Sequence, residues 1–279
     1  MFDEKNLTQL REFGFTGPVV FLKADEVKIL KEKILKYKRW IFESGFSMNQ
    51  VLNEAAHLTY KKELIEFLIK YFDDDVVSLG SRPFLGGGNP GKAIPWHHEM
   101  DFGRIFGNNV KGVQTWLSLD EANLDNGALQ VIQKSHLIKE LDPVNVYGKD
   151  IFQSKKNLHA HSIGALKEKL EKHIFEITTF NAKPGQLFLF DWKVLHRSSP
   201  YKKFSARRLT INARYVSQSE NFTHDWFNMN SKFICSEKKL YQEHLLNLKN
   251  FDLLGRKNSI RLKTYYNKML KKVNLYNEF

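Results

Sequence analysis

The sequence predicts a β-rich α+β fold, with a barrel or double-sheet jelly roll at its centre and helices before and after it. The first observation is that apolar residues recur at helical spacing before residue 76 and at strand spacing after it. The second is a series of short strands separated by turn residues, typical of an all-β core rather than a βαβ sheet. The third is a return to helical spacing after residue 216.

Residues 1–75 are expected to be mostly helical, with one short apolar strand at residues 17–22. Apolar side chains at Val27, Leu30 and Ile34 have the spacing of one helix face, and lysines occupy the other positions. A later stretch repeats this pattern before the strands begin. These helices are therefore expected to flank the core.

Residues 76–216 contain the predicted strands of the core. Strands at 112–119 and 128–132 are separated by a turn ending in Asp125-Asn126-Gly127, a sequence that strongly favours a β-hairpin. Residues 142–175 interrupt the strand pattern with a lysine-rich segment. We expect this segment to be an insert with a short helix that acts as a lid.

Residues 217–279 are expected to form a basic helical extension, because leucines recur at helical spacing among many lysines and arginines. Such helices would pack on the sheet or on a second subunit, which makes an oligomer one reading of this region. With these three parts, residues 1–279 are expected to form a single domain, since β-rich domains reach this length.

Composition limits the environment and the partners. One cysteine, Cys235, excludes an intrachain disulfide and fits a reducing cytoplasm, and no apolar run reaches the roughly 20 residues that span a bilayer. We therefore expect a cytoplasmic protein without membrane contact. The net charge of +12 favours anionic partners, but no basic stripe interleaved with aromatic residues indicates nucleic-acid binding.

The candidate metal site begins in the sequence Trp96-His97-His98-Glu99. Because strand side chains alternate, His97 and Glu99 point to one face and offer a nitrogen and an oxygen ligand. With a second histidine, for which His196 is the candidate, they would form a two-histidine, one-carboxylate site for non-haem Fe(II). Asp101 shares this face and is the alternative ligand. The other interpretation is that these are ordinary polar residues at a strand end.

Two longer stretches add a family resemblance. The stretch from Thr115-Trp116-Leu117-Ser118-Leu119-Asp120 to Ser135-His136, and that from His196-Arg197-Ser198-Ser199 to Arg208, resemble the phytanoyl-CoA dioxygenase family. The resemblance covers roughly residues 10–216. It implies a double-stranded β-helix core and an oxygenase that uses Fe(II), 2-oxoglutarate and O2.

The resemblance also implies roles for individual residues. His97, Glu99 and His196 would hold the iron at the catalytic centre, and Arg208 would bind the distal carboxylate of 2-oxoglutarate, with Arg207 as its rival. The family usually has His-x-Asp, so Glu99 is a departure, although its carboxylate is still a hard oxygen donor. Related halogenases have Ala or Gly here, so Glu99 favours hydroxylation.

Five further residues are candidates at the site. One of Gln114 and Thr115 is expected to hydrogen-bond the co-substrate, since they alternate across one strand. Trp96 and Trp116 either line the substrate pocket or fill the core, where large aromatic residues are common. Arg214 either meets an acidic group of the substrate or a second part of the co-substrate, or is a surface arginine at a strand end.

The expected function is hydroxylation of an unactivated C–H bond of a small molecule, an amino acid or a natural-product intermediate, with succinate and CO2 as co-products. One alternative is an oxygenase acting on a macromolecule or on an acyl group tethered to a carrier protein or to CoA. Desaturation and cyclisation are alternative reactions. A non-catalytic jelly-roll binding module is the third class of function.

Overall fold

The computed structural model describes most of the N-terminal three quarters of the chain. The described residues are 1–37, 48–50, 52–87, 93–94, 96–99, 111–139, 176–202, 207–217, 219 and 233–235. The segment 142–175, predicted to be a lid, and residues 236–279 of the predicted basic extension lie outside them. The chain forms two compact units, Met1–Val27 with Phe84–Asn212 and Lys28–Pro83 with Ala213–Phe279. The single-domain organisation therefore stays a prediction.

The first unit contains most of the strands. Its elements are α1 (Glu4–Phe13), β1 (Phe15–Val20), β3 (Gly112–Ser118), β4 (Leu129–Ile132), η3 (Ser135–Leu137), β5 (Ile177–Thr179), β6 (Gln186–Asp191) and β7 (His196–Ser198). Strands β2 (Val76–Gly87) and β8 (Arg207–Ser217) contribute to both units. The second unit also contains η1 (Met48–Gln50), α4 (Asn53–Thr59), α5 (Lys62–Phe72) and β9 (Phe233–Cys235), and α2 (Ala24–Lys36) begins in the first unit and continues into the second.

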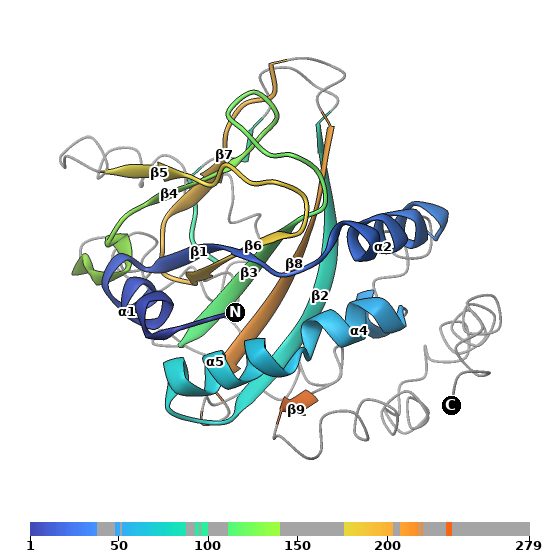
Figure 1. Ribbon diagram of the computed structural model, residues 1–279. Coiled ribbons are helices and arrows are strands. Elements are labelled where there is room, and N and C mark those ends of the chain that lie inside the picture. The colour runs from blue at the N-terminus through green and yellow to red at the C-terminus, as the bar shows by residue number, and fades with distance from the viewer. Residues whose placement is uncertain are drawn as a thin grey trace, which may run out of the picture. The chain divides into compact units, whose positions relative to one another are not determined.

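The strands form two sheets, with the orders β1-β6-β3-β8-β2-β9 and β5-β4-β7. Strand β6 pairs antiparallel with β1 and β3, and β4 pairs antiparallel with β5 and β7. Within the first unit, the three-stranded sheet lies over β1, β6 and β3 (Figure 1). This double sheet confirms the predicted β-rich α+β class with a jelly-roll core.

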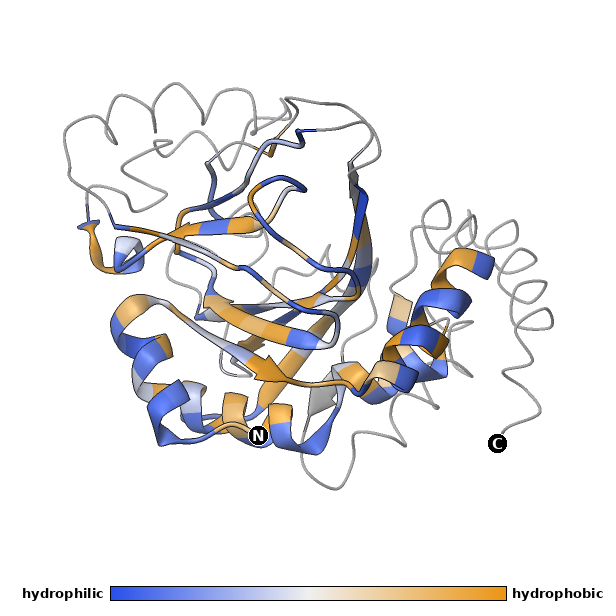
Figure 2. Cartoon of the chain, turned by 45° about the horizontal axis from the view of Figure 1, so that its top comes forward, coloured by the Kyte–Doolittle hydropathy of each residue, from blue (hydrophilic) through white to orange (hydrophobic). Residues whose placement is uncertain are grey.

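The core of the first unit lies between these two sheets. Phe180 stacks on Phe188 with ring centroids 4.1 Å apart, and Trp116 meets both rings edge-on. Each such fully buried side chain contributes about 1.5–3 kcal/mol relative to exposure. The remaining members of this cluster include Phe15, Leu129, Val131, Phe190 and Val194. Figure 2 shows the hydrophobic strands and the mixed character of the helices.

The predicted hairpin between residues 112–119 and 128–132 is wrong. Strands β3 and β4 belong to different sheets, so the connection crosses the core instead of reversing within one sheet. The turn itself forms, because Gly127 adopts φ 81° and Ala128 N donates to Asn123 O at 3.0 Å. The local turn signal was correct, but the pairing of the flanking strands depends on contacts distant in sequence.

Helix α1 and strand β1 also differ from the expected strand at 17–22. Asp3 caps α1 by accepting from Asn6 N at 2.9 Å, and Gly14 ends the helix with φ 83°. A side chain at Gly14 would meet Val194 and be strained at that φ, so glycine allows the chain to turn directly into β1 at Phe15. Pro18 is tolerated because β1 is an edge strand.

The helical faces predicted for the N-terminal region are confirmed. Val27, Leu30 and Ile34 of α2 are buried, and α5 buries Leu64 and Phe67 among others. No helix within the described ranges has both the length and the apolar character to cross a bilayer.

Candidate active site

The residues around positions 97 and 196 are brought together by backbone pairing. His97 N donates to His196 O, and His196 N donates to His97 O, each at 3.0 Å. Glu99 N donates to Trp192 O at 3.1 Å, so the segment is also held two residues after His97. Strand β7 is in turn paired with β4, where Val131 is opposite His196. Two segments about a hundred residues apart are therefore held in one register.

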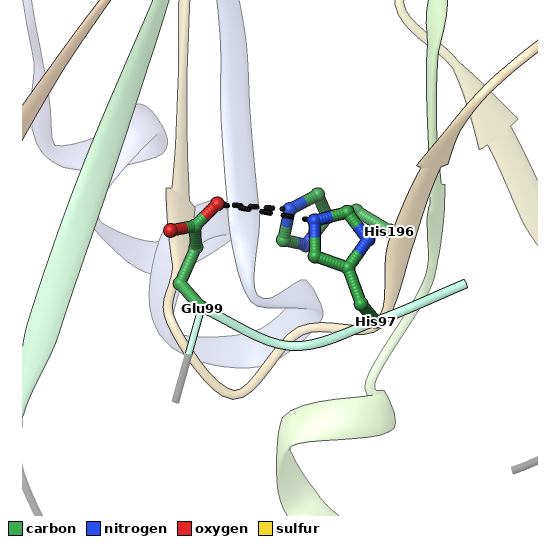
Figure 3. A group of neighbouring side chains, drawn as sticks. All are labelled: His97, Glu99 and His196. Carbon is green, nitrogen blue, oxygen red and sulfur yellow. Dashed lines mark ion pairs between the residues drawn. The ribbon is translucent and has the colours of Figure 1, made fainter. Parts of the chain in front are cut away.

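Three ligand atoms converge at this place. Glu99 Oε1 lies 3.4 Å from His196 Nε2 and 4.0 Å from His97 Nε2, and one donor atom from each residue lies within 4.8 Å of the others. The two imidazole rings are 4.1 Å apart, and the carboxylate points toward both (Figure 3). His196 is buried, whereas His97 and Glu99 are partly exposed. The cluster is thus the kind of group that could hold a metal ion.

The tautomer of His196 is set by its own turn. Its Nδ1 lies 2.9 Å from Val194 O, and because a carbonyl can only accept, Nδ1 carries the proton. The Nε2 lone pair is then directed at Glu99 and His97, as a metal ligand requires. Phe190 packs against the ring with centroids 4.7 Å apart and limits its rotation.

Gln114 supports the carboxylate from the neighbouring strand. Its Nε2 donates to Glu99 Oε1 at 3.2 Å, and the side chain is buried. Thr115 has the next position on β3 and therefore points to the opposite face, where it pairs with Leu189. Of the two residues expected to contact the co-substrate, the structure places Gln114 at the cluster and Thr115 away from it.

Arg208 is a buried cation on the strand beside β3. Only 1% of it is exposed, and its Nε and Nη1 have no hydrogen-bond partner. Its guanidinium lies 4.9 Å from the centre of the Trp116 ring. Burial lowers the pKa of Arg208, and Tyr201 and Asp120 oppose that shift. Arg207, the rival anchor, is exposed.

Arg208 and the His97, Glu99 and His196 cluster both contact the same face of β3. Gln114 and Trp116 are two residues apart, so their side chains point the same way. Gln114 contacts Glu99, and Trp116 supports Arg208. Because buried guanidinium groups require a counter-ion or acceptors, this arrangement could hold an anion close to a metal ion.

The expected substrate residues are placed differently. Trp116 is 2% exposed and belongs to the core, where its ring packs against the Arg208 guanidinium. Trp96 packs on the Arg197 guanidinium at 4.6 Å and, by strand alternation, points away from the face of His97. Arg214 belongs to the second unit, where it is partly buried. Contacts of these residues with a substrate stay predictions.

Two further residues bear on the site. His98 is buried, and burial, with His196 and His97 as smaller causes, lowers its pKa to about 3, so it is neutral near pH 7. Tyr201, seven positions before Arg208, was not expected from the sequence; no periodicity marks it, because it follows Pro200 outside any predicted strand. Asp101, the alternative ligand, lies outside the described residues.

Comparison with known proteins agrees with this geometry. The family model described as phytanoyl-CoA dioxygenase (PhyH) matches residues 10–208. No curated protein sequence is significantly similar to the chain. Among solved structures, the non-heme monooxygenase ThoJ in complex with nickel is 13% identical with a TM-score of 0.59, over 96% of this chain and 99% of that one.

Two other similar structures contain co-substrate. The epimerase SnoN in complex with Fe3+, alpha-ketoglutarate and nogalamycin RO is 12% identical, with a TM-score of 0.60 over 78% of this chain and 85% of that one. EctD from S. alaskensis with 2-oxoglutarate and 5-hydroxyectoine is 18% identical, with a TM-score of 0.59 over 80% and 78% of the two chains. At these identities the likeness concerns the fold.

Proposed function

The chain belongs to the phytanoyl-CoA dioxygenase family and is an Fe(II)- and 2-oxoglutarate-dependent oxygenase, and from this premise we propose that it hydroxylates an unactivated C–H bond of a small molecule. The substrate is an amino acid or a natural-product intermediate, and the co-products are succinate and CO2. The observation that carries the proposal is that the His97, Glu99 and His196 cluster and the buried Arg208 guanidinium both contact side chains on one face of β3, and that Nε and Nη1 of Arg208 have no hydrogen-bond partner.

The donor set fits iron. Two imidazole nitrogens and one carboxylate oxygen, with the remaining positions open, are the ligands of non-haem Fe(II) oxygenases. Donors about 2.1 Å from an ion and at right angles to one another are about 3 Å apart. The distances of 3.4 and 4.0 Å from Glu99 Oε1 to the two Nε2 atoms are close to that value. We therefore assign these three residues as the iron ligands.

The residues around the ligands prepare them for this role. When bound, iron with 2-oxoglutarate and O2 supplies the oxidising chemistry, in which the keto acid becomes succinate and CO2. His196 keeps its proton on Nδ1 because of Val194 O, so Nε2 is ready to bind. Gln114 holds Glu99 by one oxygen, and Phe190 limits water around the imidazole.

Arg208 positions the co-substrate. Its buried N–H groups are suited to the distal carboxylate of 2-oxoglutarate, because hydrogen bonds between ions are about twice as strong as neutral ones. Trp116 holds the guanidinium plane from one side. With the carboxylate fixed at this end, the keto acid end is directed along the shared face toward the metal ligands.

The substrate class and the reaction are supported by several observations. Glu99 provides the carboxylate ligand, which favours hydroxylation over halogenation. The solved structures named above contain small molecules, nogalamycin RO in SnoN and 5-hydroxyectoine in EctD. A similar structure is described as a carbocyclase, SnoK, so cyclisation and desaturation are the alternative outcomes of the same oxidation.

The net charge of +12 supports an anionic substrate, including a carrier-tethered acyl group. A cytoplasmic location is supported by the single cysteine.

Substrate-stimulated succinate release tests the proposal. The full chain with Fe(II), 2-oxoglutarate and O2 is screened against amino acids, natural-product intermediates, and acyl groups offered free or on a carrier. We expect a free small molecule to raise succinate release and to gain one oxygen by mass, whereas loss of two hydrogens would indicate desaturation or cyclisation. Stimulation only by carrier-bound acyl groups would contradict the small-molecule proposal, and succinate release retained in His97→Ala would contradict the iron site.

A further inference from the structure

Tyr201 places a second unpartnered polar atom beside Arg208. The tyrosine is 6% exposed, and its buried hydroxyl has no hydrogen-bond partner that meets ordinary geometry. It is nevertheless near enough to raise the pKa of the arginine against the effect of burial. A buried hydroxyl without a partner destabilises the folded chain. Tyr201 and Arg208 are thus neighbours, and among the described residues the phenol proton has no acceptor.

The position of the Tyr201 hydroxyl is fixed by two glycines. A Cβ at Gly86 would lie 1.7 Å from Tyr201 Oη, and a Cβ at Gly127 would lie 2.4 Å from Cζ and 2.6 Å from Oη. Only glycine at both places leaves room for the end of this side chain. Backbone pairing between Asn126 and Tyr201 holds the same contact from the turn.

The Asp125-Asn126-Gly127 turn contacts Tyr201 instead of connecting two strands of a β-hairpin. Gly127, at φ 81°, brings its backbone against the tyrosine ring, where no side chain could fit. Lys202 N donates to Asp125 O at 2.9 Å, so the residue after Tyr201 is also tied to the turn. Gly86 is on β2, which neighbours β8, and Thr210 Oγ1 of β8 donates to Phe84 O of β2 at 3.5 Å. The Tyr201 hydroxyl against Gly86 is therefore close to the part of β8 that carries Arg208.

We propose that the Tyr201 hydroxyl donates a hydrogen bond to the carboxylate that Arg208 binds, and so selects keto acids that carry a second carboxylate. The inference rests on the proposed role of Arg208 as the anchor of 2-oxoglutarate. A neutral phenol adds a donor without a further charge, and it satisfies one oxygen of the carboxylate while Arg208 satisfies the remaining acceptor sites. Tyr201 is thereby a specificity-determining binding residue.

The test compares two keto acids on Tyr201→Phe. The full chain, loaded with Fe(II) without oxygen, is titrated by calorimetry with 2-oxoglutarate and with 2-oxopentanoate, which has the same carbon chain but no distal carboxylate. Since a hydrogen bond to a charged group contributes about 1.5–3 kcal/mol, we expect 2-oxoglutarate to bind about ten- to a hundredfold more weakly. The affinity for 2-oxopentanoate should stay within about twofold, because its chain end makes no hydrogen bond.

Tyr215→Phe is the matched control. Tyr215 is also buried, but its hydroxyl donates to Thr59 O at 2.7 Å. Its loss should lower the melting temperature and leave 2-oxoglutarate affinity unchanged, whereas Tyr201→Phe should not lower the melting temperature of the ligand-free protein. Equal weakening for both keto acids, or none for 2-oxoglutarate, would overturn the role of Tyr201 alone. Wild-type protein without iron-dependent 2-oxoglutarate binding would overturn the proposed function as well.

Discussion

The His97, Glu99 and His196 cluster and Arg208 contact one face of β3, through Gln114 and Trp116, but the polar groups of the two sites find partners in different ways. At the cluster, His196 Nδ1 has Val194 O and Glu99 has Gln114. At the anchor, Arg208 Nε and Nη1 and the Tyr201 hydroxyl are buried without partners. The imidazole and the carboxylate of the first site have partners within the protein, whereas we propose that an anion supplies the partners at the second.

Because of this difference, we expect variants at the two sites to change ligand affinity and protein stability in different ways. A buried cation without a partner destabilises the folded chain. A carboxylate that binds Arg208 should therefore bind tightly and raise the thermal stability of the protein. At the cluster, Val194 O and the Gln114 amide already supply hydrogen bonds to His196 and Glu99, so we expect no such gain from an anion there. Variants at the two sites should therefore fail at different steps.

Loss of a metal ligand should have the largest effect. Glu99→Gln keeps the shape of the side chain but removes its charge, and we expect iron affinity to fall by more than the roughly 10–100-fold that supporting residues cost. Succinate formation should be abolished. Anaerobic calorimetry with Fe(II) measures the affinity, and Glu121→Gln, an exposed carboxylate on the turn after β3, is the control. Unchanged iron binding in Glu99→Gln would remove Glu99 from the ligand set.

Arg208→Met should separate the two sites. Iron affinity should stay near the wild-type value, while 2-oxoglutarate binding should weaken by about a hundredfold or more, because the charged partner is lost. The ligand-free variant should be as stable as the wild type or more stable, since an unpaired buried charge is removed. Thermal melting with and without 2-oxoglutarate checks both points. A marked loss of stability without ligand would mean that the guanidinium already has a partner in the protein.

Gln114→Leu should have an intermediate effect. Without the Gln114 amide, Glu99 Oε1 loses one hydrogen bond, and we expect iron affinity to fall by roughly tenfold, as for other outer-shell partners of metal ligands. Thr115→Val, one position along β3 and equally buried, changes the opposite face and should leave iron affinity unaltered. If the two variants bind iron equally well, the Gln114 contact has no part in holding the ligand.

The smallest effect is expected in the second unit, at Asp74. Hydrogen bonds from Ser217 above all, and from Ser219, lower the pKa of Asp74 from 3.8 to about 2. The stabilisation is therefore complete above about pH 4 and is lost as the pH falls toward 2. Asp74→Asn should be slightly less stable than wild type at pH 6, and the difference should shrink as the pH falls to 3. Urea unfolding at both pH values measures it, and a constant difference would contradict the assignment.

Local patterns in the sequence predicted much of this arrangement. Period two placed His97 and Glu99 on one face, and helical spacing identified the buried side of α2. The choice between Gln114 and Thr115 could not be made, because it depends on which face of β3 covers the core. Strand alternation gives the direction of Trp96 relative to His97, but the contact of Trp96 with Arg197 depends on the pairing of residues 97 and 196, which no local pattern reveals.

The arginine anchor shows the same limit. Family resemblance indicated Arg208, but the need for an anion appears only from its burial against Trp116 and from its unpartnered nitrogens. No sequence pattern marked Tyr201, because the position of its side chain depends on Gly86 and Gly127, which precede it by 115 and 74 residues. The Asn126-Gly127 turn was identified as a turn, but its contact with the tyrosine required the long-range pairing of the two segments.

The most direct test is equilibrium binding of 2-oxoglutarate to the full chain, measured without oxygen, in the presence and absence of Fe(II). If His97, Glu99 and His196 hold iron next to the Arg208 anchor, the keto acid should bind one site per chain. That binding should be much tighter with iron, and His196→Ala should abolish the gain. Equal affinity with and without Fe(II), or an iron-dependent gain that survives His196→Ala, would contradict the account.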